Sequence, residues 1–111
     1  WNDGEILKGE AKLAASLASG NVMPRVLLTA GGLEETADNN PTLPPGMTRE
    51  QLEEMLRTAG VIRNIEALAE RLRTMIGSAS CEVETFVFDG ETHISVMAPL
   101  FSRGLRFALK P

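Results

Sequence analysis

Apolar residues recur with the spacing of a helix face in three segments of the chain. Residues 2–20 form the first segment, in which Asn2 has the character of a helix N-cap. Residues 48–77 form the second, and the third follows Pro99, whose missing N–H is tolerated in the first turn of a helix. The pattern therefore predicts amphipathic helices in all three segments.

Local signals refine the ends of these helices. Thr48 and Gln51 have the spacing of a capping box, which predicts that a helix begins there. Gly60 interrupts the long periodic segment and is able to divide it into two helices. Gly104 lies inside the last segment, where we expect it to allow a close approach between the helix and its neighbour.

The other apolar residues form two short runs, near residues 25–30 and 82–88. The first is continuous and ends at a pair of glycines, as expected for a strand that is covered on both faces. A helical segment separates the two runs, which predicts a right-handed crossover between parallel strands. The fold class expected is therefore α/β, with three layers in the order αβα. Two strands are few for a stable covered sheet.

Composition and charge restrict the classes of function. The chain has 111 residues, of which 43% are hydrophobic and 23% are charged, and this balance indicates one small globular domain at most. A net charge of −4 and dispersed basic residues argue against binding to nucleic acid or to an anionic membrane. Cys81 is the only cysteine, so an internal disulfide is excluded. The chain begins at Trp1 without a methionine, which suggests a fragment, a mature chain or an excised part of a longer protein.

The candidate chemistry centres on His93, the only histidine. It follows the second predicted strand in a short polar loop, at the end of the strand where open α/β sheets place their active sites. The first strand is followed by Glu34, Glu35 and Asp38, and Glu34 is the preferred partner because it directly follows the strand and its glycines. Such a carboxylate can accept the Nδ1–H of the histidine and leave Nε2 to act as a base. The alternative is that these are exposed loop side chains.

These segments resemble the C-terminal part of an α/β-hydrolase serine esterase, in the putative-esterase family that includes the trilactone (enterobactin-type) siderophore esterases. The resemblance covers almost all of the chain as part of a single domain, residues 1–111. Four quoted segments carry it: Trp1-Asn2-Asp3, Arg25-Val26-Leu27-Leu28-Thr29-Ala30-Gly31-Gly32-Leu33-Glu34, Phe88-Asp89-Gly90-Glu91-Thr92-His93 and Ser102-Arg103-Gly104-Leu105-Arg106-Phe107. They are similar to the turn after the sixth strand, the seventh strand with its acid-bearing turn, the eighth strand with its histidine loop, and the closing helix.

The resemblance implies a serine-type carboxylic ester hydrolase that acts on a small-molecule ester, with siderophore esters as one candidate. In that class the catalytic residues follow the chain as Ser, then Asp or Glu, then His. The present residues would supply Glu34 and His93 but contain no nucleophile elbow of the form Gly-x-Ser-x-Gly. We therefore expect these 111 residues alone to be inactive, and to associate with the missing N-terminal part of the domain or with themselves.

No cofactor or metal ion is expected. Asp89 and Glu91 lie near His93, but a catalytic zinc site needs three protein ligands with suitable spacing, and the sequence does not provide them. The competing hypothesis is a noncatalytic module, either a hydrolase-like binding protein or a structural unit. An elbow serine upstream of these residues would favour the enzyme, and its absence would favour the binding or structural role.

Overall fold

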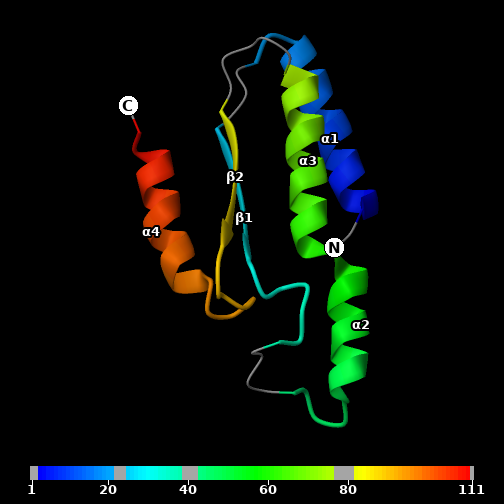
Figure 1. Cartoon of the computed structure of the whole chain (residues 1–111). Helices are drawn as coiled ribbons and strands as arrows, with labels where there is room; N and C mark the ends of the chain where they lie inside the picture. Colours follow the sequence, from blue (N-terminus) through cyan, green and yellow to red (C-terminus); the bar gives the residue numbers. More distant parts are fainter. Residues whose placement is uncertain (1–2, 22–24, 39–42, 77–81, 111) are drawn as a thin grey trace.

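The computed structural model describes residues 3–21, 25–38, 43–76 and 82–110. Within these ranges the chain forms four helices and two strands (Figure 1). In chain order they are α1 (Asp3–Ala18), β1 (Val26–Gly31), α2 (Arg49–Ala59), α3 (Val61–Ile76), β2 (Val83–Phe88) and α4 (Met97–Ala108). Asn2, which the sequence analysis placed at a helix start, and Cys81 lie outside the described residues.

The two strands form a parallel sheet in which Val26 pairs with Val83 and Gly31 pairs with Phe88. Helices α1 and α3 lie on one side of the sheet and α4 lies on the other (Figure 1). The structure is thus a small mixed α/β domain with a two-stranded parallel sheet, as the sequence predicted at this level. Both strands begin and end within one residue of the predicted ranges 25–30 and 82–88.

The core lies between the sheet and helix α3. Ala69, Leu72 and Val83 form its buried centre. Half-buried residues from strand β1 and from helices α1 and α3 surround this centre: Leu13, Leu17, Val26, Leu28 and Leu68. Full burial of one such aliphatic side chain contributes about 1.5 to 3 kcal/mol, so this cluster is the main force that fixes α3 on the sheet.

A capping box and a glycine set the helix boundaries within the long helical segment, as the sequence predicted. The Thr48 hydroxyl accepts a hydrogen bond from Gln51 N at 3.2 Å, and the Gln51 side chain accepts one from Thr48 N at 2.9 Å, which confirms the predicted capping box. Gly60 has φ +53°, a left-handed conformation that favours glycine and ends α2. The predicted interruption at Gly60 is therefore confirmed, and α3 begins at the next residue.

Helix α4 packs differently from the expectation. Pro99 lies in its first turn, as predicted. The expected close approach at Gly104 is wrong, because a Cβ atom added there would meet nothing within 4 Å. Helix α4 instead presents an exposed apolar stripe that consists of Met97, Phe101, Leu105 and Leu109, with the spacing i, i+4. Its buried anchor is Phe107, on another side of the helix.

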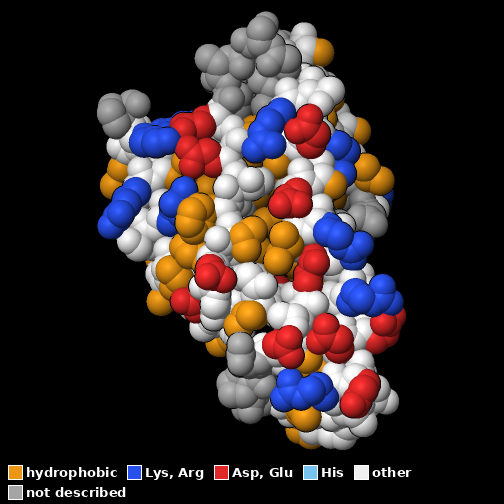
Figure 2. Space-filling model, viewed as in Figure 1, with side chains coloured by type: hydrophobic (Ala, Val, Ile, Leu, Met, Phe, Trp, Pro, Cys, Tyr) orange, Lys and Arg blue, Asp and Glu red, His pale blue; other side chains and the backbone are white. Residues whose placement is uncertain are grey.

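The molecule is less compact than a typical domain with this number of residues. Its radius of gyration is 16.4 Å, whereas a compact domain of this size has about 13 Å. Its accessible surface of 7392 Å² likewise exceeds the value of about 6000 Å² expected for a compact monomer of this mass. On the face seen in Figure 2, hydrophobic side chains gather in the middle between charged ones. Within the described ranges, no helix has the length and apolar character needed to cross a membrane.

Candidate active site

Glu34 and His93 lie together beyond the carboxyl ends of the two strands. The Nδ1 atom of His93 is 2.9 Å from Oε2 of Glu34, although the residues are 59 positions apart in the sequence. This distance confirms the contact that the sequence analysis expected. Because β1 and β2 are parallel neighbours, the loops that follow them leave the sheet at the same edge. The pairing of the strands therefore brings the two side chains together.

The last residue of β1 must be small for the two loops to meet. A Cβ atom on Gly31 would collide with the Glu91 carbonyl oxygen and would lie 2.9 Å from that of Thr92. Two hydrogen bonds join the loops at this point, from Gly32 N to Phe88 O at 2.8 Å and from Leu33 N to Glu91 O at 2.9 Å. The glycine is needed here for close approach of backbone to backbone.

The Glu34 carboxylate is the one polar or charged side chain that is buried among the described residues, with an exposed fraction of 6%. Its Oε1 atom accepts a hydrogen bond from Gly31 N at 2.8 Å, and its Oε2 atom faces His93. Each oxygen thus has a partner, as a buried carboxylate requires. An ionised carboxylate can only accept, so this contact requires the imidazole proton to be on Nδ1.

The rest of the imidazole faces solvent. The His93 side chain is 86% exposed, and within the described part of the chain its one polar contact is with Glu34. When Nδ1 carries the proton of the neutral ring, Nε2 has a free lone pair that can accept a proton from a nearby hydroxyl. No serine among the described residues contacts Nε2. The site thus contains an oriented base without a nucleophile.

The two other candidate acids have different surroundings. The Oε1 atom of Glu35 accepts hydrogen bonds from Ile62 N at 2.9 Å and from Arg63 N at 3.2 Å, so Glu35 caps the first turn of α3. Asp38 is exposed, and its backbone N–H donates to the Thr36 hydroxyl at 3.1 Å. Neither carboxylate contacts His93. The preference for Glu34 over these two agrees with the geometry.

The histidine loop is fixed by hydrogen bonds that the sequence analysis did not predict. Thr92 N donates to Ser95 Oγ at 2.9 Å, and Ser95 N donates to Thr92 Oγ1 at 3.2 Å. The Ser95 hydroxyl also donates to the Glu91 carboxylate. The spacing Thr-x-x-Ser before the last helix is a local sequence signal that could have predicted these reciprocal hydrogen bonds. These contacts hold the backbone on both sides of His93.

The site has no further group that could bind a metal ion through three ligands. Within the described residues, no cluster of three or more His, Cys, Asp or Glu side chains is suitable for a metal. The Glu91 carboxylate is engaged by Ser95, and Asp89 is exposed at the turn after β2. The contact between Glu34 and His93 orients the imidazole for proton transfer.

Comparison of the chain with protein-family models, with curated proteins and with solved structures finds no match.

Proposed function

We propose that this chain supplies the acid and the histidine of a serine-type carboxylic ester hydrolase of the α/β-hydrolase class. The observation that carries the proposal is the 2.9 Å contact between His93 Nδ1 and the buried Glu34 carboxylate, with Nε2 toward solvent. A carboxylate, an imidazole and an open base position at the carboxyl edge of parallel strands are what the second half of a catalytic triad requires.

The proposed mechanism assigns each side chain one task. Glu34 accepts the Nδ1–H of His93, holds the ring in place and stabilises the imidazolium that forms during reaction. His93 takes the proton of an attacking serine hydroxyl through Nε2 and later donates it to the leaving alcohol. The serine and the donors to the oxyanion are expected from a segment other than these residues. The substrate class proposed is a small-molecule ester, and the resemblance to siderophore esterases supports a siderophore ester as one candidate.

The shape of the molecule supports the need for an additional segment. Among the described residues the sheet has two strands, and the apolar stripe of α4 is exposed, with Phe101 at 66% and Leu109 at 78%. Exposed apolar surface of this kind marks a place where another chain segment or subunit packs. Further strands beside the sheet would cover such surface and could also carry a serine toward His93.

Labelling with a fluorophosphonate tests the proposal, because this reagent reacts with serines that are activated by an oriented base. We expect the full-length protein to gain one adduct, and we expect His93→Ala to abolish the labelling. The isolated 111 residues should not react, and they should hydrolyse p-nitrophenyl acetate no faster than free imidazole does.

A structural role is the alternative outcome of the same experiment. In that case Glu34 and His93 would only join the two loops, and the full-length protein would not be labelled. Labelling that persists in His93→Ala would also contradict the proposal, because the activated serine would then depend on another base. Circular dichroism of the variant is the control for folding.

A further inference from the structure

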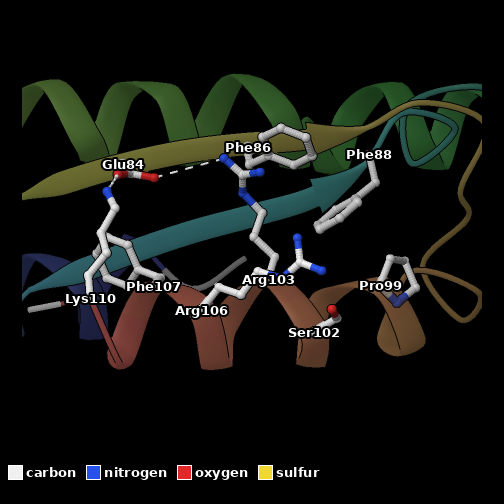
Figure 3. A pocket seen from close by; sticks show the side chains of 9 residues that line it. All are labelled: Glu84, Phe86, Phe88, Pro99, Ser102, Arg103, Arg106, Phe107 and Lys110. Atoms are coloured by element: carbon white, nitrogen blue, oxygen red, sulfur yellow. Dashed lines mark hydrogen bonds and ion pairs between the residues drawn. The ribbon is translucent and has the colours of Figure 1, made fainter.

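A second candidate site lies between strand β2 and helix α4, apart from the Glu34–His93 pair. It is a groove of about 630 Å³, a volume within the usual range of small-molecule sites. Its apolar lining consists of Phe86, Phe88, Phe107 and Pro99. Figure 3 shows the groove with β2 along one side and α4 along the other. Such a lining fits a flat apolar group.

Basic side chains of α4 and of the segment after it line the same groove. Arg103 lies over the ring of Phe86, with its guanidinium carbon 3.5 Å from the ring centre. Its Nε atom is buried and has no hydrogen-bond partner among the described residues. Arg106 makes no hydrogen bond or ion pair with any described residue, and in Figure 3 its side chain extends into the groove. Both guanidinium groups therefore keep donors that are not used.

The acidic residue of the groove is already neutralised. Glu84 accepts a hydrogen bond from Lys110 Nζ at 2.8 Å and faces Arg103 at 3.9 Å. Glu84 is the only acid in the lining, against the cations Arg103, Arg106 and Lys110. The groove is thus locally positive although the whole chain carries a net charge of −4. This excess favours an anionic ligand over a neutral or cationic one.

We propose that this groove binds a small amphipathic carboxylate, an acid with a planar apolar body and a single negative charge. The apolar body would lie against Phe88 and Pro99, and the carboxylate would accept hydrogen bonds from Arg106. Arginine suits this role because its planar donors match the two oxygens of a carboxylate. The proposal does not depend on the catalytic role of Glu34 and His93.

Naphthoate is a suitable probe, and its binding to the full-length protein can be measured by isothermal titration calorimetry. Naphthylmethanol, which lacks the charge, and inorganic phosphate, which lacks the apolar body, are the matched ligands. We expect naphthoate to bind at least about tenfold more tightly than either of them, because only naphthoate combines a charge-assisted hydrogen bond with an apolar body, and a tenfold change corresponds to about 1.4 kcal/mol. Equal affinity for the alcohol or for phosphate would overturn the proposal, and so would the absence of naphthoate binding.

Four variants locate the binding site. Arg106→Gln should weaken naphthoate binding about tenfold without a change in fold, because Arg106 has no partner in the described part of the chain, whereas Arg106→Lys should retain part of the affinity. Arg57→Gln is the matched control, since Arg57 is exposed on α2 and outside the groove, and it should bind as the wild type does.

Phe101→Ala changes the exposed stripe of α4. If Phe101→Ala abolishes binding while Arg106→Gln does not, the ligand lies on the stripe and the proposed site is wrong.

Discussion

At the scale of single residues, the two adjacent glutamates after β1 have separate tasks. The Glu34 carboxylate is buried and binds Gly31 N and His93 Nδ1. The Glu35 carboxylate turns the other way and accepts the N–H groups of Ile62 and Arg63 at the start of α3. The short segment therefore connects the candidate site to the helix that packs on the sheet. Separate substitutions of Glu34 and Glu35 can therefore distinguish an effect on the candidate site from an effect on the stability of the fold.

Gly31→Ala should disrupt the candidate site. The added methyl group would collide with the carbonyl oxygens of Glu91 and Thr92, which are backbone atoms and cannot rotate away. We expect a loss of about 1 to 3 kcal/mol in the free energy of unfolding, as for other overpacked positions. Chemical denaturation measures this loss, and the Nδ1–H signal of His93 in the proton NMR spectrum should weaken with it.

Gly9→Ala is the matched control for this substitution. Gly9 lies inside α1, and a Cβ atom there would meet nothing within 4 Å. Alanine should stabilise the helix by about 0.5 to 1 kcal/mol at such a position. If Gly31→Ala were as stable as Gly9→Ala, the close approach of the two loops would be incorrect.

Glu35→Ala should lower stability without removing the histidine contact. It leaves the N–H groups of Ile62 and Arg63 without their carboxylate, and the loss of a helix cap costs about 1 kcal/mol. Asp38→Ala, at an exposed position, should change the free energy of unfolding by less than about 0.5 kcal/mol. Equal stability of these two variants in urea denaturation would show that Glu35 does not cap α3.

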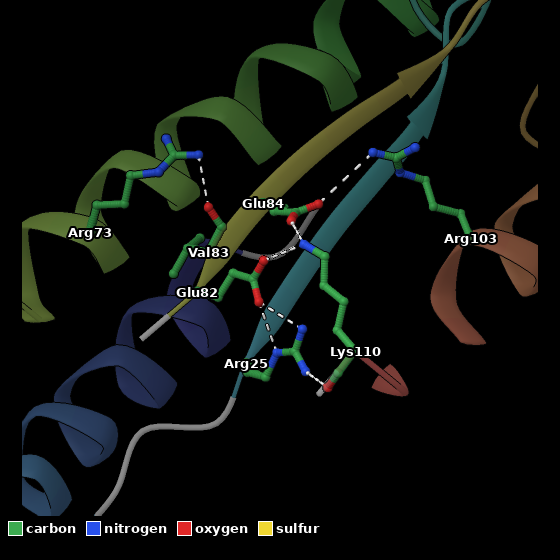
Figure 4. A network of polar contacts seen from close by, with 7 residues as sticks. All are labelled: Arg25, Arg73, Glu82, Val83, Glu84, Arg103 and Lys110. Atoms are coloured by element: carbon green, nitrogen blue, oxygen red, sulfur yellow. Dashed lines mark hydrogen bonds and ion pairs between the residues drawn. The ribbon is translucent and has the colours of Figure 1, made fainter. Parts of the chain in front are cut away.

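At the scale of elements, a charged network joins the starts of both strands to the segment after α4 (Figure 4). Glu82 receives hydrogen bonds from Arg25 Nε at 2.9 Å and from Lys110 Nζ at 2.6 Å. Arg25 also donates to the Lys110 carbonyl oxygen at 2.9 Å, and its guanidinium lies 4.8 Å from the centre of the Phe107 ring. The network thus fixes the end of α4 near the amino end of the sheet.

The network predicts a loss of stability in acid. The hydrogen bond from Lys110 is the main cause that lowers the pKa of Glu82 from 4.5 to about 2, and bonds with Glu84 and Arg25 add to it. The pKa of Glu82 is lower in the folded state than in the unfolded state. The contribution of ionised Glu82 to the free energy of unfolding is therefore complete above pH 4.5 and is lost as the pH falls through about 2. Glu82→Gln should flatten this part of the curve of unfolding free energy against pH. The effect should be modest, since the group is at the surface.

Glu66→Gln serves as the control for the acid titration. Glu66 is exposed on α3 and makes no ion pair with a described residue. Its stability curve should run parallel to that of the wild type between pH 5 and pH 2. A parallel curve for Glu82→Gln as well would show that the charged network does not stabilise the fold.

The sequence predicted the helices and strands of this fold better than the contacts between distant residues. Apolar continuity identified the first strand, a second short apolar run identified the other, and the capping box and Gly60 identified the boundaries of α2, because each signal is local. The position of Glu34 directly after the first strand favoured it over Glu35 and Asp38 as the partner of His93. The collision at Gly31 and the capping by Glu35 depend on residues 27 to 61 positions away, and no local pattern reports them. The expectation for Gly104 failed for the same reason.

At the scale of the whole molecule, apolar surface of the described residues is exposed on helix α4. Helix α4 has one face on the sheet and leaves Met97, Phe101, Leu105 and Leu109 exposed. Both strands also have one edge without a neighbour in the described sheet. Open edges and apolar stripes promote association.

The isolated 111 residues should therefore self-associate, and sedimentation velocity should show species larger than the monomer. The double variant Phe101→Glu and Leu105→Glu should shift the distribution toward monomer, because it places two charges on the stripe. Leu7→Glu changes an exposed leucine of α1 and should have a smaller effect. A stable monomer that unfolds cooperatively would contradict the need for additional structure.

The most direct test of the catalytic proposal compares two isosteric changes at neighbouring positions in the full-length protein. Glu34→Gln keeps the shape of the side chain but removes the charge that holds the Nδ1–H of His93, so kcat for ester hydrolysis should fall by roughly three to four orders of magnitude. Glu35→Gln removes the same charge at the start of α3 and should leave kcat within about threefold of the wild type while it lowers stability. If Glu34→Gln retained wild-type kcat, or if both variants lost activity equally, Glu34 and His93 would not form the catalytic pair.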